Sequence, residues 1–190
     1  MPNESWETVY FDRAGRENTD ETLRLAKKRA EKLGIKNIVV ASSSGATGVR
    51  AAEILTGYNL IVVTHVAGFK EPNVQWLLPE NRAIMEKKGV KIITAAHAFG
   101  TLGRAVNRKF NTIQVDEIIA NVLRLFGPGV KVATEVTCMA TDAGYIMTDQ
   151  DAIGIGGSGG GADSAIVVKP TNTHTFFDLK IREIICKPHL

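Results

Sequence analysis

The sequence predicts an α/β protein, a doubly wound three-layer sandwich with helices on both faces of a mostly parallel sheet. Segments with strand and helix patterns alternate along most of the chain, which is typical of parallel strands joined by crossover helices. The segments NIVVAS (37–42) and LIVVTH (60–65) are continuous apolar runs. Such runs are expected of strands that helices cover on both faces.

The first elements follow from capping residues and from apolar spacing. ETVYF (7–11) is an extended start. A helix follows, because Asn18 or Thr19 suits its beginning, acidic residues suit its first turn, and Gly34 suits its end. At helical spacing the segment has one apolar stripe, formed by Leu23, Ala26, Ala30 and Leu33. We expect that stripe to pack on the sheet.

The rest of the chain continues the alternation and then changes character. Further elements are predicted as helices at 46–56, 79–88, 101–110, 115–126 and 130–144, and as a strand in KIITAA (91–96). The last part instead contains three strand patterns joined by a Gly-rich and a Thr/Asn-rich loop: DAIGIGG (151–157), SAIVVKP (164–170) and DLKIREIICK (178–187). We therefore expect antiparallel or mixed strands at the end of the sheet.

Composition narrows the class of protein. The 190 residues, 44% of them apolar, suffice for one domain with a real core. The 23 Lys and Arg are spread among 20 Asp and Glu, which argues against a nucleic-acid partner. Cys138 and Cys186 form no CxxC pair, and neither a leader nor a run of about 18 apolar residues is present. We expect a cytoplasmic protein with no membrane partner.

The segment ASSSGATG (41–48) lies between the first buried strand and the next helix. In open α/β sheets, ligands bind beyond the carboxyl ends of the strands, where helix amino termini present unpaired N–H groups. Gly45 would let the backbone approach a ligand, and Ser43, Ser44 and Thr47 would supply hydroxyl groups. The pattern favours a phosphate, although the same residue types also serve as helix caps and packing residues. No GK[ST] or GxGxxG pattern points to a nucleoside triphosphate.

Other candidate residues fall at the same predicted edge of the sheet. The loop GGSGGG (156–161) is interpreted either as a ligand loop or as a hairpin turn. His65 and His97 each follow a strand and would either line a pocket or play a structural role. With no acidic or thiol ligand spaced to join them, no metal is expected.

Further side chains near this edge have two interpretations each. Arg104 would either bind an anion bidentately or lie in solvent. Phe69, Trp76 and Phe99 would either stack on a flat ring or belong to the core. No Ser-His-Asp or Cys-His arrangement follows from spacing, so no residue is nominated as catalytic.

Two long segments resemble the carboxy-terminal domain of pyruvate kinase. NIVVASSSGATGVRAAEILTGYNLIVVTH (37–65) is similar to the strand, Ser/Thr-rich turn and helix that hold a phosphate of the kinase's allosteric sugar bisphosphate. VTCMATDAGYIMTDQDAIGIGGSGGGADSAIVV (136–168) is similar to the closing helix, strand, Gly-rich loop and strand. The resemblance spans roughly residues 35 to 170 and is weakest between 66 and 125. It is closest to stand-alone proteins built like this single domain.

The resemblance implies a fold, a ligand and a set of site residues. The fold is one domain over 1–190, a sheet of 3-2-1-4-5 type, with 1–34 and 171–190 as family-specific extensions. The implied ligand is flavin mononucleotide (FMN), a small phosphorylated molecule with a flat ring. The phosphate is expected at Ser43, Ser44, Gly45 and Thr47, the facing loop at Gly157, Ser158 and Gly159, and the space beside the ring at His65, His97 and Phe99.

Two departures from the kinase shape the functional expectation. No barrel precedes the domain in this sequence, so we predict no pyruvate kinase activity. Gly-Gly replaces the Trp-Arg pair of the kinase's Gly-rich loop, which argues against a sugar bisphosphate and leaves room for a larger ligand. We expect a phosphate-anchored FMN-binding domain, with flavin redox chemistry if it is an enzyme. The alternatives are a non-catalytic sensor of a phosphorylated metabolite and an assembly module, and self-association as a homo-oligomer fits the family.

Overall fold

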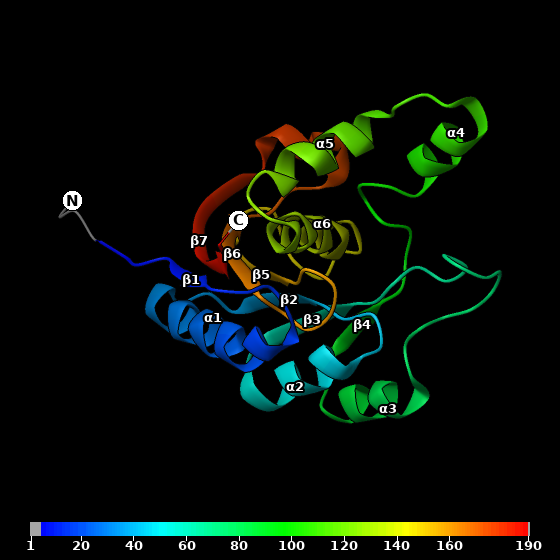
Figure 1. The fold of residues 1–190 in the computed structure, drawn as a ribbon. Helices are drawn as coiled ribbons and strands as arrows, with labels where there is room; N and C mark the ends of the chain where they lie inside the picture. The colour runs from blue at the N-terminus through cyan, green and yellow to red at the C-terminus, as the bar shows by residue number, and fades with distance from the viewer. Residues whose placement is uncertain (1–4, 190) are drawn as a thin grey trace.

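A computed structural model describes residues 5–189, within which seven strands form one sheet (Figure 1). Its order is β1-β7-β6-β5-β2-β3-β4, and β6 runs antiparallel to both of its neighbours while the other pairs are parallel. From β4 to β6 this is the predicted 3-2-1-4-5 arrangement, and the expected antiparallel pairing at the carboxy-terminal end is confirmed. The strands are β1 (Val9–Phe11), β2 (Asn37–Ala41), β3 (Asn59–Val63), β4 (Lys91–Ile93), β5 (Ala152–Gly156), β6 (Ser164–Lys169) and β7 (Lys180–Pro188).

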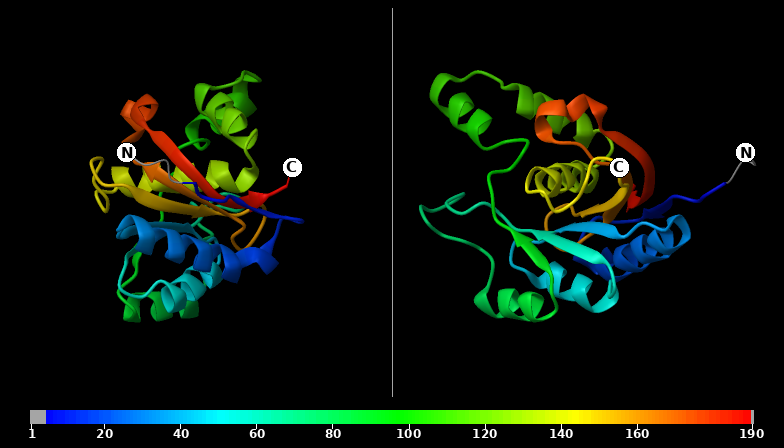
Figure 2. Two further views of the ribbon diagram at one scale, coloured as in Figure 1. Left: turned by 90° about the vertical axis from the view of Figure 1, so that its left-hand side faces the viewer. Right: turned by 180° about the vertical axis from the view of Figure 1, so that it is seen from behind.

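Helices cover both faces of the sheet and complete the three layers (Figure 2). On one face lie α1 (Thr19–Leu33), α2 (Ala46–Ile54) and α3 (Pro79–Lys87). On the other face lies α6 (Pro128–Asp142), and α5 (Val115–Arg124) packs on α6. Two short 3-10 helices, Arg16–Asn18 and Thr173–Asp178, flank this framework.

Alternating side chains of the parallel strands belong to two separate hydrophobic cores, one on each face of the sheet. Ile38 and Val40 of β2 pack with the apolar residues of α1, α2 and α3, whereas Val39 packs with those of α6. All three are fully buried. Strands buried on both faces explain why β2 and β3 are continuous apolar runs, as the sequence predicted.

Two helices end at the residues that the sequence predicted would terminate them. Gly34 ends α1 in the left-handed conformation (φ 69°), and Asn111 does the same after α4 (Leu102–Phe110). α1 begins where the sequence predicted, with Asn18 at the N-cap position, but neither side chain caps the helix: the Asn18 side chain donates to the carbonyl of Arg13 and the Thr19 hydroxyl donates to that of Arg16. Both side chains stabilise the preceding turn instead.

α4 and α5 form a helical arm in which α5 packs on α6 and α4 stands away from the body of the molecule (Figure 1). α4 buries none of its residues against the rest of the described chain. Large apolar side chains are exposed along the arm, among them Leu102, Phe110, Val115 and Leu125. Within residues 5–189, no helix has the length and apolarity needed to cross a bilayer. Self-association stays a prediction.

α6 packs tightly on β5, and two glycines of β5 make this contact possible. A Cβ on Gly154 would lie 2.6 Å from the Thr137 Oγ1 and 2.7 Å from the Ala133 carbonyl oxygen. Gly156 approaches the carbonyl of Gly129, at the start of α6, in the same way. Close packing here brings the amino terminus of α6 against the end of β5 and the loop that follows it.

We expect Gly154→Ala to lower the free energy of unfolding by about 3 kcal/mol, because the new methyl group meets backbone atoms that cannot rotate away. Urea unfolding measures the change. Gly144→Ala is the control, since nothing lies within 4 Å of a Cβ at that position and its left-handed backbone alone should cost about 1 kcal/mol. Equal losses in the two variants would contradict the proposed tight contact.

Candidate functional site

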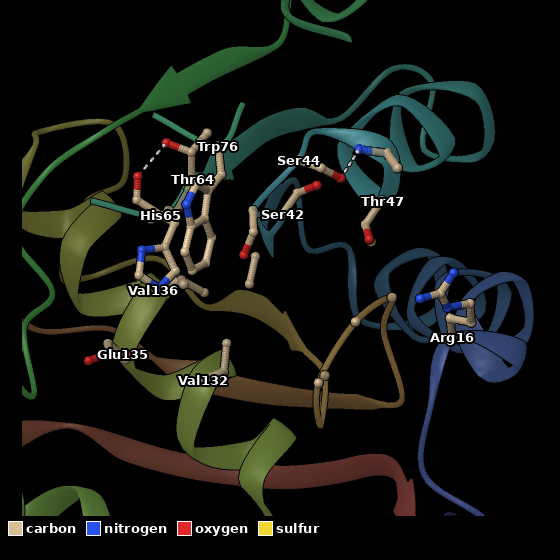
Figure 3. Close-up of a pocket in the computed structure, with 18 of the residues that line it drawn as sticks. Arg16, Ser42, Ser44, Thr47, Thr64, His65, Trp76, Val132, Glu135 and Val136 are labelled. Carbon is tan, nitrogen blue, oxygen red and sulfur yellow. Dashed lines mark hydrogen bonds between the residues drawn. The ribbon is translucent and has the colours of Figure 1, made fainter. Parts of the chain in front are cut away.

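A cleft of about 840 Å³ opens beyond the carboxyl ends of β2, β3, β4 and β5 (Figure 3). Its walls come from the segments that follow these strands and from α6 and the start of α1. Of the eleven site residues that the sequence predicted, eight line it: Ser43, Ser44, Thr47, His65, His97, Arg104, Gly157 and Gly159. The parallel order of the strands brings these distant residues to one edge, as ligand sites in open α/β sheets require.

One end of the cleft is the amino terminus of α2. Ser43 and Thr47 line the cleft, and their hydroxyls bond to no residue between 5 and 189. Ser42 instead caps the helix, since its Oγ accepts from the Gly48 N–H at 3.1 Å. The first turn of α2 contains no acidic side chain, so the helix dipole and the hydroxyl groups together favour an anion.

The structure explains the glycine at position 45 by packing, whereas from the sequence we expected it to let the backbone approach a ligand. Its backbone is left-handed (φ 92°), and a Cβ there would lie 2.6 Å from both the Asn81 Cβ and the Leu77 Cδ1. The carbonyl of Ser44 also accepts from the Asn81 amide at 2.9 Å and from the Leu78 N–H at 3.1 Å. Gly45 does not line the cleft. It fits the turn before α2 tightly against the turn that begins α3.

The Gly-rich loop forms the facing wall, and a buried carboxylate shapes it. Gly157 and Gly159 line the cleft, whereas Ser158 turns to Asp163, which accepts from the Ser158 N–H at 3.1 Å. Asp163 is fully buried and also accepts from the Gly15 N–H at 3.2 Å. Sequence reasoning missed Asp163, although an acidic residue between a glycine run and a strand was a visible signal.

The other end of the cleft is a cluster of rings around His65 (Figure 3). The His65 ring centroid lies 4.3 Å from Trp76, 4.4 Å from Phe69 and 4.5 Å from His97. Arg104 lies at this end, with its guanidinium carbon 5.1 Å from the Phe69 ring centroid and its Nε donating to the Gly100 carbonyl. The cleft therefore has a flat, aromatic end opposite its hydroxyl-lined end.

The two histidines are held as neutral rings. The Nε2 of His97 accepts a hydrogen bond from the Val66 N–H at 3.2 Å, which requires that nitrogen to be unprotonated. Burial lowers the pKa of His97. Burial also lowers the pKa of His65, and the hydrogen bond of His65 with the Val66 backbone opposes part of that shift. Both rings can therefore pack against aromatic neighbours without a charge near neutral pH.

A buried ion pair on α6 lines the cleft beside the rings. Lys131 Nζ donates to Glu135 Oε2, and Glu135 Oε1 accepts from the Phe99 N–H at 2.9 Å. Burial lowers the pKa of Lys131. Phe99 does not line the cleft; it is buried and packs edge-on against Phe176. Sequence reasoning missed the pair, although a Lys and a Glu four residues apart in an apolar helix were its signal.

A third group of cleft residues belongs to the beginning of the chain and to α2. Arg16, Thr19 and Asp20 line the cleft beside the Gly-rich loop. Asp20 accepts two hydrogen bonds of 2.7 Å from Arg50, which lower the pKa of its carboxyl. Among the described residues, no group of three or more His, Cys, Asp or Glu is arranged to hold a metal ion.

A family comparison identifies the domain. The model of the pyruvate kinase alpha/beta domain matches residues 20–168, most of the chain. The chain belongs to the pyruvate kinase alpha/beta domain family. The match begins inside α1 and ends inside β6, so β1, β7 and the 3-10 helix Arg16–Asn18 lie outside it.

Solved pyruvate kinases of Cryptosporidium parvum are among the similar structures. One shares 16% identity over 72% of this chain at a TM-score of 0.37, and another shares 15% over 86% at a TM-score of 0.35. A third, in complex with ADP, shares 17% identity over 72% of this chain at a TM-score of 0.36. The alpha/beta domain protein spans about a fifth of the length of these kinases.

We expect the alpha/beta domain protein to lose stability as the pH falls below about 6.5, the ordinary pKa of histidine. Because the folded pKa of His97 is lowered, the unfolded chain binds more protons in that range, and acid therefore favours unfolding. His97→Gln removes this titration while an amide oxygen can still accept from Val66. Urea unfolding at pH 7.5 and 5.5 should show a smaller acid loss in this variant.

His174→Gln is the control, because His174 is exposed and lies outside the cleft. It should keep the pH dependence of the wild type. An acid loss in His97→Gln as large as that of the wild type would contradict the account of a neutral, buried His97.

Proposed function

We propose that the cleft binds flavin mononucleotide, with the phosphate at the amino terminus of α2 and the flat ring at the His65 cluster. The observation that carries the proposal is that the two ends of a single cavity have different chemistry. Hydroxyl groups and a helix amino terminus lie at one end, and four rings lie at the other. A ligand that joins one phosphate to one flat ring matches both ends.

The phosphate end has the chemistry that a dianion needs. Ser43 and Thr47 offer hydroxyl groups that no described residue uses, and the positive end of the α2 dipole points at the same space. The glycines of the loop 157–161 leave the opposite wall without side chains, apart from Ser158, which turns toward Asp163. The loop can therefore approach a bulky group with its backbone.

The ring end favours a planar heterocycle over a sugar. Trp76, Phe69 and the neutral His65 offer aromatic faces and edges. Val132, Val136 and Met139 of α6 add an apolar wall. Lys131 and Glu135 of the same helix neutralise each other, and Arg104 is the other charged side chain at this end. Aromatic and aliphatic walls with a few polar groups are typical of cofactor pockets.

The residues present fit FMN, and the cofactor would supply the electron-transfer chemistry when bound. The chain would supply binding and orientation: Ser43, Ser44 and Thr47 at the phosphate, and His65 and Trp76 at the ring. Lys131 and Glu135, paired with each other, would lie beside the ring with no net charge. The alternative function, a sensor of a phosphorylated metabolite, would use the phosphate end without the ring end.

We expect FMN to bind and to raise the melting temperature. With free FMN at 100 times its dissociation constant, the gain is about 2.7 kcal/mol, equivalent to roughly 5–10 °C for a chain of this size. Ser44→Asp combined with Thr47→Asp should weaken binding more than about 100-fold, because two carboxylates would face the phosphate. Flavin absorbance titrations and thermal melts measure both effects.

The double variant should still fold, since acidic residues in the first turn of a helix are favourable. Thr56→Asp combined with Thr112→Asp is the charge-matched control, because both positions are exposed and lie outside the cleft. No change in flavin absorbance and no thermal shift in the wild type would reject FMN. A shift with sugar phosphates alone would favour the sensor.

A further inference from the structure

Four cationic side chains line the cleft, and three of them are already engaged. Arg50 makes a bidentate pair with Asp20, Lys131 pairs with Glu135, and Arg104 bonds to the Gly100 carbonyl and lies over the Phe69 ring. The fourth is Arg16, whose side chain pairs with no carboxylate among residues 5–189. Arg104 also pairs with no described carboxylate, but the Arg16 guanidinium is the one cationic group of the cleft with neither a hydrogen bond nor an ion pair among residues 5–189.

The backbone of Arg16 is fixed against the Gly-rich loop. Its carbonyl accepts from the Thr19 hydroxyl at 2.7 Å, and the same Thr19 oxygen accepts from the Ala162 N–H at 3.0 Å. A Cβ on Gly161, which is left-handed at φ 69°, would lie 2.5 Å from the Arg16 Cα. On the other side, the Gly15 N–H donates to the buried carboxylate of Asp163. A flexible segment would not hold a charge at one place, whereas this one is tied at three points.

The side chain of Arg16 extends along the loop at the hydroxyl-lined end of the cleft. Its Nη2 lies 3.9 Å from the Cβ position of Gly160. Figure 3 shows Arg16 on the same side of the cleft as Thr47, away from His65 and Trp76. Arg16 and the amino terminus of α2 therefore approach the same space from two walls.

We propose that Arg16 binds the phosphate group of the ligand and makes the site selective for a phosphate monoester over its unphosphorylated counterpart. The inference rests on the proposed function, and it adds a residue that lies outside the family match, which begins at residue 20. A guanidinium matches phosphate with two parallel N–H donors, and the hydroxyls and the helix dipole by themselves are neutral or carry partial charges. Arg16 supplies a full positive charge, which offsets one of the two negative charges of a phosphate dianion.

Titrations of FMN and riboflavin against the wild type, Arg16→Ala and Arg16→Lys test the proposal. The two ligands share the ring, and they differ in the phosphate. Loss of a charged hydrogen-bond donor should weaken FMN binding about 10- to 100-fold in Arg16→Ala. Riboflavin affinity should stay within about twofold of the wild type, and Arg16→Lys should recover part of the FMN affinity because it keeps the charge.

Arg13→Ala is the matched control, since Arg13 is an exposed arginine three residues away that does not line the cleft. It should bind both ligands as the wild type does. Ligand-free melting temperatures equal to that of the wild type would show that the Arg16 variants are folded.

Three results would overturn the inference. Unchanged FMN affinity in Arg16→Ala would reject the phosphate contact while leaving the proposed function intact. Equal weakening of FMN and riboflavin would assign Arg16 a structural role in the loop. Failure of the wild type to bind FMN would reject both the inference and the function on which it rests.

Discussion

The parallel course of β2, β3, β4 and β5 is the constraint on which the rest of the molecule depends. Parallel strands are buried on both faces, so their sequences must be apolar throughout. The polar residues of the cleft therefore occur after each strand has ended. Because the strands run in one direction, those ends meet at one edge. Ser43, His65 and Gly157 are far apart in the chain and share a cleft for this reason.

The two ends of the cleft differ because different elements supply them. The hydroxyl-lined end is made by the first turn of α2 and by the Gly-rich loop, where short side chains and backbone groups leave room for an anion. The aromatic end is made by the segment between β3 and α3, whose rings gather around a neutral His65. Burial, which keeps the histidines uncharged, thus also keeps the second end apolar.

Local sequence signals predicted the parts of the site that local structure determines. Ser43 and Thr47 follow a buried strand and open a helix, so the sequence was sufficient to assign them to the sheet edge. The order of the strands followed from the family resemblance. Gly45 was predicted to let the backbone approach a ligand, but its tight packing on Asn81 depends on how α3 returns to α2, which no local pattern encodes.

The rest of the site depends on contacts between distant segments. Asp163 joins the Gly-rich loop to Gly15 across 148 positions of the chain, and this contact fixes Arg16 beside the cleft. Phe99 and Phe69 are both aromatic residues after strands, and only their packing separates them: Phe99 turns toward Phe176, while Phe69 packs on His65. Spacing in the sequence contains no information about either choice.

The most direct test of the central claim, a single cleft that holds a flat ring at its aromatic end, is the fluorescence of Trp76. The chain has two tryptophans, and Trp6 packs on Arg29 outside the cleft, so Trp6→Phe leaves Trp76 as the sole tryptophan signal. FMN titrated into this variant should quench Trp76 to saturation at one equivalent, whereas glycerol phosphate should not. FMN binding by absorbance with no quenching of Trp76 would place the ring elsewhere and contradict the account.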